Sequence, residues 1–179
     1  EITPPEQALR IELASLRRSI TQLIGAPVIL HGTRDAQTLG FARRTDADTI
    51  SQQGPATPDH VIRTKRVPMI GRDVAAYAEA YRQYFEAHVG ESAKTMLDPA
   101  PRVLLDPEFG LCTVGRSVQD AFIVRDIYQH TIDTVVRATQ LERYQALPAR
   151  DYFDVEYWDL EQAKLRKAGK PPVFAGEVV

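Results

Sequence analysis

Apolar side chains recur at helical spacing in three long stretches of the chain, each preceded by a residue that suits a helix N-cap. The N-cap residues are Thr3, Asp73 and Ser117, whose side-chain oxygens can accept a hydrogen bond from a backbone N–H of the first turn. Glycine follows two of the stretches, at Gly25 and Gly90, and glycine is favoured just beyond a helix end. The pattern therefore predicts helices over residues 4–24, 74–88 and 118–139.

Shorter apolar runs between turn-forming residues predict strands at residues 27–31, 39–42, 67–70, 102–105 and 111–114. The first run is typical of a buried strand. The last two runs flank a turn that contains Pro107 and Gly110, which indicates a β-hairpin. Strand and helix signals alternate around this hairpin. We therefore predict an α/β layered domain in which helices cover a mixed β-sheet.

Two polar segments complete the pattern. Residues 43–54 carry Ile50 as their only large apolar side chain and predict a loop. Residues 151–158 are acidic and aromatic, and Asp154 and Glu156 are interpreted there either as paired acids or as part of a solvated turn. A last helix is predicted over residues 160–168.

The composition is that of an ordinary globular protein, with 44% hydrophobic and 26% charged residues among 179. The net charge of −2 argues against nucleic acid and membrane surfaces as partners, and no apolar run is long enough to span a bilayer. Cys112 is the only cysteine, which rules out an internal disulfide and favours a cytoplasmic location. The missing initiator Met and the apolar ending at 176–179 lead us to expect a piece of a longer polypeptide.

Residues 54–71, which we call the basic motif, contain the densest group of residues suited to chemistry. Thr57 suits an N-cap and the proline after it suits the first helical position, so a short helix is predicted from residue 58 to just before Pro68. The N–H groups at a helix start, together with two cations and an imidazole, suit a phosphate or carboxylate. The candidate substrate- or anion-binding residues are Thr57, Asp59, His60, Arg63 and Lys65. The alternative is a capped surface helix with solvated charges, in which Asp59 pairs with Arg63.

The histidines do not have the close spacing that is typical of zinc ligands. They are His31, His60, His88 and His130. We therefore predict no metal site and no bound zinc in this chain. A glycine-rich phosphate loop and a dinucleotide-binding fingerprint are also absent from the sequence.

Cys112 lies in an apolar run, which predicts a buried and unreactive thiol rather than a nucleophile. We expect Cys112 and Phe109 to pack against the helix that begins near Ser117.

Three segments carry a family resemblance: G-P-A-T-P-D-H-V-I-R-T-K-R at 54–66, L-D-P-A-P-R-V-L-L-D-P-E-F-G-L-C-T-V-G-R-S at 97–117, and D-Y-F-D-V-E-Y-W-D-L-E-Q-A-K-L at 151–165. In this order they resemble large bacterial proteins of the rhamnulose-1-phosphate aldolase/alcohol dehydrogenase type. Such proteins join a class II aldolase/adducin-like region to a short-chain dehydrogenase domain. The resemblance implies a class II aldolase-like fold.

The resemblance also implies a domain organisation and partners. Residues 1–150 would form one aldolase-like lobe, and residues 151–179 a C-terminal extension and linker towards a dehydrogenase domain. The expected partners are an upstream aldolase lobe and a downstream dehydrogenase domain of the same polypeptide, with a sugar phosphate as the substrate. A homo-oligomer is compatible with this organisation.

The chain departs from the family in its zinc ligands. Class II aldolases hold a catalytic zinc with a His-x-His pair, a further His and a nearby acidic residue, and the pair is absent here. The further His corresponds to Phe109, which has no metal-binding atom. We therefore transfer no catalytic residue, expect no cofactor in this chain, and assign zinc and NAD only to the full-length protein.

Two functions follow as hypotheses. In the first, the chain is a lobe of the aldolase-like region of a bifunctional sugar-phosphate aldolase/short-chain dehydrogenase, and it contributes basic residues to a substrate site that is completed elsewhere. In the second, it is a non-catalytic structural or oligomerisation module. Under either hypothesis the isolated chain is expected to be inactive.

Overall fold

The computed structural model describes residues 7–160 and residue 163. The predicted cap at Thr3 and most of the predicted helix at 160–168 lie outside the described residues. In the described part of the chain, none of the helices combines the length and apolar character needed to cross a membrane. The elements are, in order, α1 (Gln7–Ile24), β1 (Ile29–Thr33), α2 (Ala36–Ala42), α3 (Ala47–Ile50), the 3₁₀ turn η1 (Pro58–His60), α4 (Val61–Thr64), β2 (Met69–Ile70), α5 (Val74–Val89), β3 (Val103–Asp106), β4 (Gly110–Gly115), α6 (Val118–Leu141) and α7 (Ala149–Glu156).

A four-stranded sheet in the order β1-β4-β3-β2 lies at the centre of the fold. Strands β1 and β3 pair with β4 antiparallel, while β2 pairs with β3 parallel, so the predicted mixed sheet is confirmed. The β3–β4 hairpin is also confirmed, with Asp106 opposite Gly110. The Asp106 carboxylate accepts the backbone N–H groups of Glu108 and Phe109, and these hydrogen bonds stabilise the tight turn.

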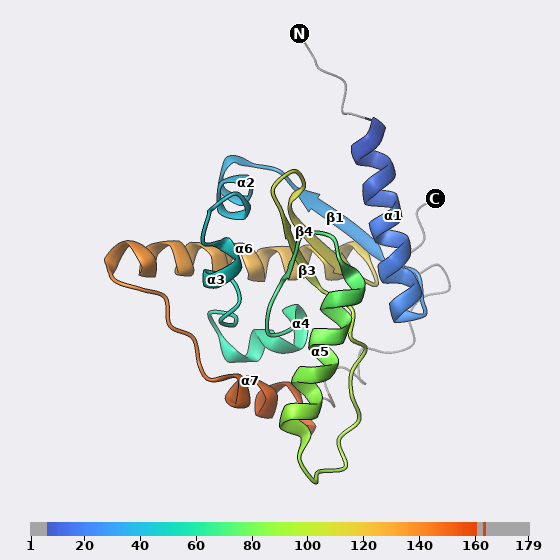
Figure 1. Ribbon diagram of the computed structural model, residues 1–179, viewed down its shortest axis with the longest axis vertical. Helices are drawn as coiled ribbons and strands as arrows, with labels where there is room; N and C mark the ends of the chain where they lie inside the picture. Colours follow the sequence, from blue (N-terminus) through green and yellow to red (C-terminus); the bar gives the residue numbers. More distant parts are fainter. Residues whose placement is uncertain (1–6, 161–162, 164–179) are drawn as a thin grey trace.

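Helices cover both faces of the sheet. Alternate residues of a strand point to opposite faces, so one strand contributes side chains to both layers of the core. On one face, Cys112 and Val114 of β4 share a core cluster with Ile20 of α1. On the other face, Leu111 of the same strand shares a cluster with Ile132 of α6. Figure 1 shows the long helix α6 running across the sheet, away from α1 and α5. The predicted α/β layered architecture is therefore confirmed.

Two long helices begin at their predicted caps. The side chain of Asp73 accepts the backbone N–H of Ala76 at the start of α5, and that of Ser117 accepts the N–H of Asp120 at the start of α6. Helix α5 ends before Gly90, which adopts a positive φ of +57° that glycine tolerates without steric cost.

Two local predictions from the sequence are wrong. The run at 39–42, predicted as a strand, lies within helix α2, which Asp35 caps by accepting the backbone N–H of Thr38. The predicted loop at 43–54 contains the short helix α3, which buries Ile50. Runs this short carry too few apolar positions for their period to distinguish a helix from a strand.

Strand β1 occupies the predicted place but is only half-buried. It lies at one end of the sheet order, so β4 is its single strand partner in the described part of the chain. All five of its residues keep some exposure. An apolar run does not encode whether a strand lies at the edge or in the middle of a sheet, because that depends on the remaining strands.

Cys112 is buried as predicted, but it faces away from α6. Cys112 and Phe109 belong to the cluster that contains residues of α1 and α5, whereas α6 packs on the opposite face of the sheet. The prediction that both residues pack against the helix beginning near Ser117 is therefore wrong. The register of the hairpin decides the face, and a shift of one residue would exchange the two faces.

We expect Cys112 to react slowly with a thiol reagent under native conditions. Its side chain is 1% exposed, and burial raises the pKa of the thiol to about 12, so little reactive thiolate is present near neutral pH. Labelling followed by mass spectrometry should be about a hundredfold or more slower than in the urea-unfolded chain. Native labelling at the unfolded rate would show that β4 is not the buried strand described here.

Candidate functional site

The basic motif folds into two short helical turns and then reverses direction. The 3₁₀ turn η1 leads directly into α4. The hydroxyl of Thr64, at the end of α4, lies within hydrogen-bond distance of the backbone carbonyls of His60 and Lys65 and can donate its hydrogen to either. The helix ends at Lys65, which has a φ of +64°. Residues other than glycine rarely adopt a positive φ. The helix predicted from residue 58 to Pro68 is therefore shorter than expected. Thr57 precedes it but its side chain makes no capping hydrogen bond.

The first half of the motif faces helix α6. Arg63 lies 4.0 Å from the carboxylate of Asp120, and both side chains are more than two-fifths exposed. Arg63 therefore lies beside Asp120 rather than forming the alternative pair with Asp59. The pKa of His60 is lowered, first by burial and then by the charge of His130, and its Nδ1 is buried without a hydrogen-bond partner.

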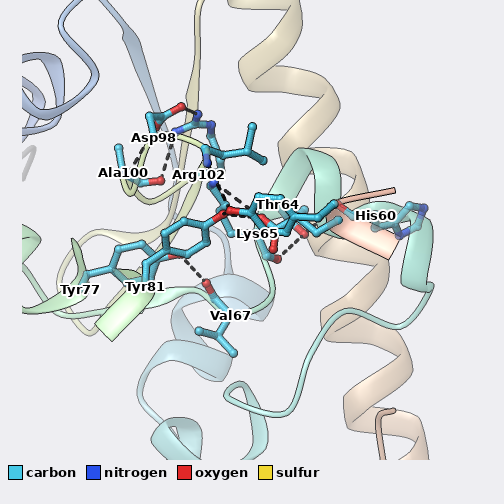
Figure 2. A network of polar contacts seen from close by, with 12 residues as sticks. His60, Thr64, Lys65, Val67, Tyr77, Tyr81, Asp98, Ala100 and Arg102 are labelled. Carbon is cyan, nitrogen blue, oxygen red and sulfur yellow. Dashed lines mark hydrogen bonds and ion pairs between the residues drawn. The ribbon is translucent and has the colours of Figure 1, made fainter. Parts of the chain in front are cut away.

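The second half of the motif turns into the protein interior. The side chain of Lys65 is 5% exposed, and its Nζ lies 3.6 Å from Oε1 of the fully buried Glu156. The same Nζ lies 4.0 Å from the centroid of the Tyr81 ring, a cation–π contact. Figure 2 shows Lys65 directed towards Tyr81, whereas the His60 ring points away from this network.

Two tyrosines complete the network around the buried pair. Tyr81 donates its hydroxyl hydrogen to Glu156 Oε1 at 2.8 Å, and its hydroxyl oxygen lies 2.7 Å from that of Tyr157. Because Tyr81 uses its only hydrogen on the carboxylate, Tyr157 must donate to Tyr81. Tyr157 in turn accepts the backbone N–H of Leu97 at 3.2 Å. The network joins α4, α5, α7 and the segment before β3.

Burial dominates the electrostatics of this pair. It lowers the pKa of Lys65 to about 8, although the charge of Glu156 acts in the opposite direction. It raises the pKa of the Glu156 carboxyl, although Lys65 and the Tyr81 hydroxyl act in the opposite direction. An Arg102–Asp98 ion pair of 2.6 Å lies close enough to influence Lys65. In this arrangement the buried ammonium of Lys65 and the buried carboxylate of Glu156 partly compensate each other's charge.

The five candidate anion-binding residues do not form one cluster. His60 and Arg63 lie on the side of α4 that faces α6, while Lys65 is enclosed and paired with Glu156. Lys65 is therefore already occupied by a carboxylate within the chain. Anion binding by Thr57, Asp59, His60 and Arg63 stays a prediction.

Helix α7 lies at the predicted boundary between the lobe and its extension. Tyr152 and Phe153 of α7 are fully buried, and the Tyr152 hydroxyl donates to the carbonyl of Pro55 at 2.7 Å. The start of the basic motif and the start of the extension are therefore packed together. The division at residue 150 itself stays a prediction.

The chain also matches a known protein family. The model of a family described as "Aldolase class II, second domain" matches residues 7–165. The chain belongs to this class II aldolase family. The aldolase part of the resemblance is thereby confirmed.

One curated relative extends the comparison. This class II aldolase domain is 29% identical over 157 residues to the uncharacterized oxidoreductase YuxG of Bacillus subtilis (strain 168). The alignment covers 78% of the chain but 23% of the relative, so the chain spans less than a quarter of that protein. No solved structure matches the chain.

The described residues of this class II aldolase domain do not fit a zinc site. Among residues 7–160 and 163, no three His, Cys, Asp or Glu side chains are placed to hold a metal ion. At the position expected for the further histidine ligand, the Phe109 ring is buried and lies 4.0 Å below the guanidinium of Arg72. That guanidinium also bonds Asp106, so this corner of the hairpin is an arginine-centred ion-pair cluster.

The role of Glu156 was not predicted from the sequence, where Glu156 was interpreted as part of either an acid pair or a solvated turn. The structure contradicts both interpretations, because Glu156 is fully buried while Asp154 is exposed and pairs with Arg150. A signal was present, since Tyr152 and Phe153 lie four and three residues before Glu156 and so share its helical face. An acid on an aromatic face predicts a buried carboxylate that needs a partner.

Proposed function

We propose that this chain is one lobe of the aldolase-like region of a bifunctional sugar-phosphate aldolase/short-chain dehydrogenase. In this proposal it supplies basic residues to a substrate site that other parts of the protein complete. The family match over residues 7–165 carries the proposal. The name of the relative, an oxidoreductase much longer than this chain, supports an attached dehydrogenase.

The first half of the basic motif, in which Arg63 is exposed and His60 is half-buried, contains the residues that this chain can contribute to such a site. His60 and Arg63 are next to α6 on a surface that another lobe can approach. The partners are accordingly the upstream aldolase lobe and the downstream dehydrogenase domain of one cytoplasmic polypeptide. Zinc and NAD belong, in this proposal, to those other parts.

A non-catalytic structural module is the second candidate function. The observation that favours it is the enclosure of Lys65, because the most buried cation of the motif serves to hold α7 rather than a ligand. The module would then position the other lobes or mediate self-association.

Replacing Arg63 by Met in the whole protein should weaken use of a sugar phosphate. A charge-assisted contact contributes about 1.5–3 kcal/mol, which corresponds to a loss of about ten- to a hundredfold in kcat/KM for aldol cleavage. His60→Asn should also lower kcat/KM, because the imidazole is next to the same surface. Steady-state kinetics with a sugar phosphate checks both variants.

Arg82→Met is the matched control, because Arg82 is an exposed arginine paired with Glu79 on α5. Thermal melts should show that all three variants are folded. Unchanged kinetics for both Arg63→Met and His60→Asn would favour the structural module.

A further inference from the structure

A small cavity of about 130 Å³ lies between α5 and the end of the basic motif. Its lining includes Arg66 and Gln52 on one side and the α5 residues Tyr77, Tyr81 and Tyr84 on the other. Drug-sized ligands occupy pockets of about 300–1,000 Å³. The cavity therefore suits a molecule of only a few non-hydrogen atoms and excludes a whole sugar phosphate.

Among the described residues that line the cavity, Arg66 is the one with a charged side chain. It lies over the Tyr84 ring, 5.1 Å from the ring centroid, and makes one long hydrogen bond of 3.4 Å to the carbonyl of Gln52. Within the described part of the chain no carboxylate lies within 4.0 Å of it, in contrast to Arg72 and Arg102. A guanidinium carries five N–H donors, so Arg66 keeps donors available for an anion.

The tyrosines around the cavity have committed their hydroxyl hydrogens elsewhere. Tyr77 donates to the carbonyl of Val67 at 3.0 Å, Tyr81 to Glu156, and Tyr84 to the carbonyl of Ala149 at 3.3 Å. They therefore present aromatic carbon rather than donors to the cavity. Oε1 of Glu156 lies 3.6 Å from Lys65 Nζ and accepts the Tyr81 hydroxyl hydrogen. Arg66 acts on Glu156 through space without a direct ion pair among the described residues.

We propose that this cavity binds a small aliphatic carboxylate. The planar guanidinium matches the two oxygens of a carboxylate in a bidentate pair, and the aromatic walls accept a body of two or three carbons. The inference does not depend on the aldolase–dehydrogenase proposal, because it uses residues on the opposite side of Lys65 from His60 and Arg63.

The test is an NMR titration of the isotope-labelled 179-residue chain with sodium propionate at constant ionic strength. Propionamide is the matched neutral probe and inorganic phosphate the matched tetrahedral anion. Propionate should bind saturably with a Kd of about 1 mM, which is within the ceiling of about −1.5 kcal/mol per non-hydrogen atom for very small ligands. Propionamide lacks the charge, and phosphate would place charged oxygens rather than an apolar body against the aromatic walls, so both should bind at least about tenfold more weakly.

Variants locate the binding. Arg66→Gln and Arg66→Lys should each weaken propionate binding about tenfold or more, since a lysine ammonium does not reproduce the planar fork. Ala80→Leu keeps the cation but fills the cavity mouth from an exposed position of α5, and it should also weaken binding. Arg82→Gln, on the same helix but outside the lining, should leave binding unchanged.

Three results would overturn the proposal. They are an absence of saturable propionate binding, equal or tighter binding of phosphate or propionamide, and propionate binding that persists in Arg66→Gln or Ala80→Leu. The Ala80→Leu variant keeps the test decisive if the Arg66 variants do not fold.

Discussion

Replacing Lys65 by Met is expected to lower the free energy of unfolding by about 3–5 kcal/mol, the usual cost of removing one partner from a buried ion pair. The variant leaves the carboxylate of Glu156 fully buried without the lysine charge, while the Tyr81 hydroxyl still donates to it. Urea denaturation followed by circular dichroism measures the change. The expected loss is large because neither partner can reach water in the folded state.

Lys94→Met is the matched control for this experiment. Lys94 also lies near an aromatic ring, with its Nζ 5.1 Å from the Phe153 centroid, but no ion pair is found for it among the described residues. Its replacement should cost about 1 kcal/mol or less, because Lys94 is half-buried and loses only a cation–π contact. Similar losses for the two lysine variants would contradict a specific role for the pairing with Glu156.

The double variant Lys65→Met/Glu156→Met should recover most of the lost stability. Burial lowers the pKa of Lys65 and raises the pKa of Glu156, so both shifts disfavour the ionised pair at neutral pH. Two apolar side chains of similar volume avoid that cost, and such replacements are often neutral or stabilising. A double variant that is less stable than Lys65→Met would show that the pair itself stabilises the fold.

The sign of the pH dependence follows from the lowered pKa of Lys65. An unfolded lysine holds its proton up to about pH 10.4, whereas the folded residue releases it near the pKa of about 8. Between these values the unfolded state binds more protons, so the stability contributed by Lys65 rises with pH and is lost as the pH falls. Relative to Lys65→Met, the parent chain should therefore gain stability from pH 8 to pH 10.

Replacing Gly110 by Ala is the second substitution with a large expected effect, a loss of about 2–5 kcal/mol of unfolding free energy. Gly110 has a φ of +72°, which costs a non-glycine residue about 1–2 kcal/mol. An added Cβ would also lie 2.5 Å from the carbonyl oxygen of Thr33, in the edge strand β1. Relief of that overlap requires backbone shifts, which add about 1–3 kcal/mol.

Gly71 provides a control with nearly the same φ. Its φ is +71°, but an added Cβ would have no atom within 4 Å. Gly71→Ala should therefore show only the conformational cost. Equal losses for the two variants in urea denaturation would mean that β1 does not approach the hairpin as closely as the structure indicates.

The basic motif shows how much of the candidate site the sequence could predict. Its location and its short helix followed from local features, namely a proline at the helix start and a following proline at Pro68, but the position of His60 and Arg63 beside α6 did not. The enclosure of Lys65 did not, because its left-handed backbone is not encoded by the residue type. Its partner Glu156 comes from α7, far away in the chain, and is brought near only by packing.

The sequence by itself determined the elements whose signals are local. Asp73 and Ser117 cap helices through hydrogen bonds that span three residues, and Asp106 closes a hairpin through its own neighbours. Only the tertiary structure decided that Cys112 faces α1 rather than α6, and which groups neutralise Lys65 and leave Arg66 available. The physical reason is that a cap or turn forms within a few residues, whereas strand register and the pairing of buried charges depend on which distant elements meet.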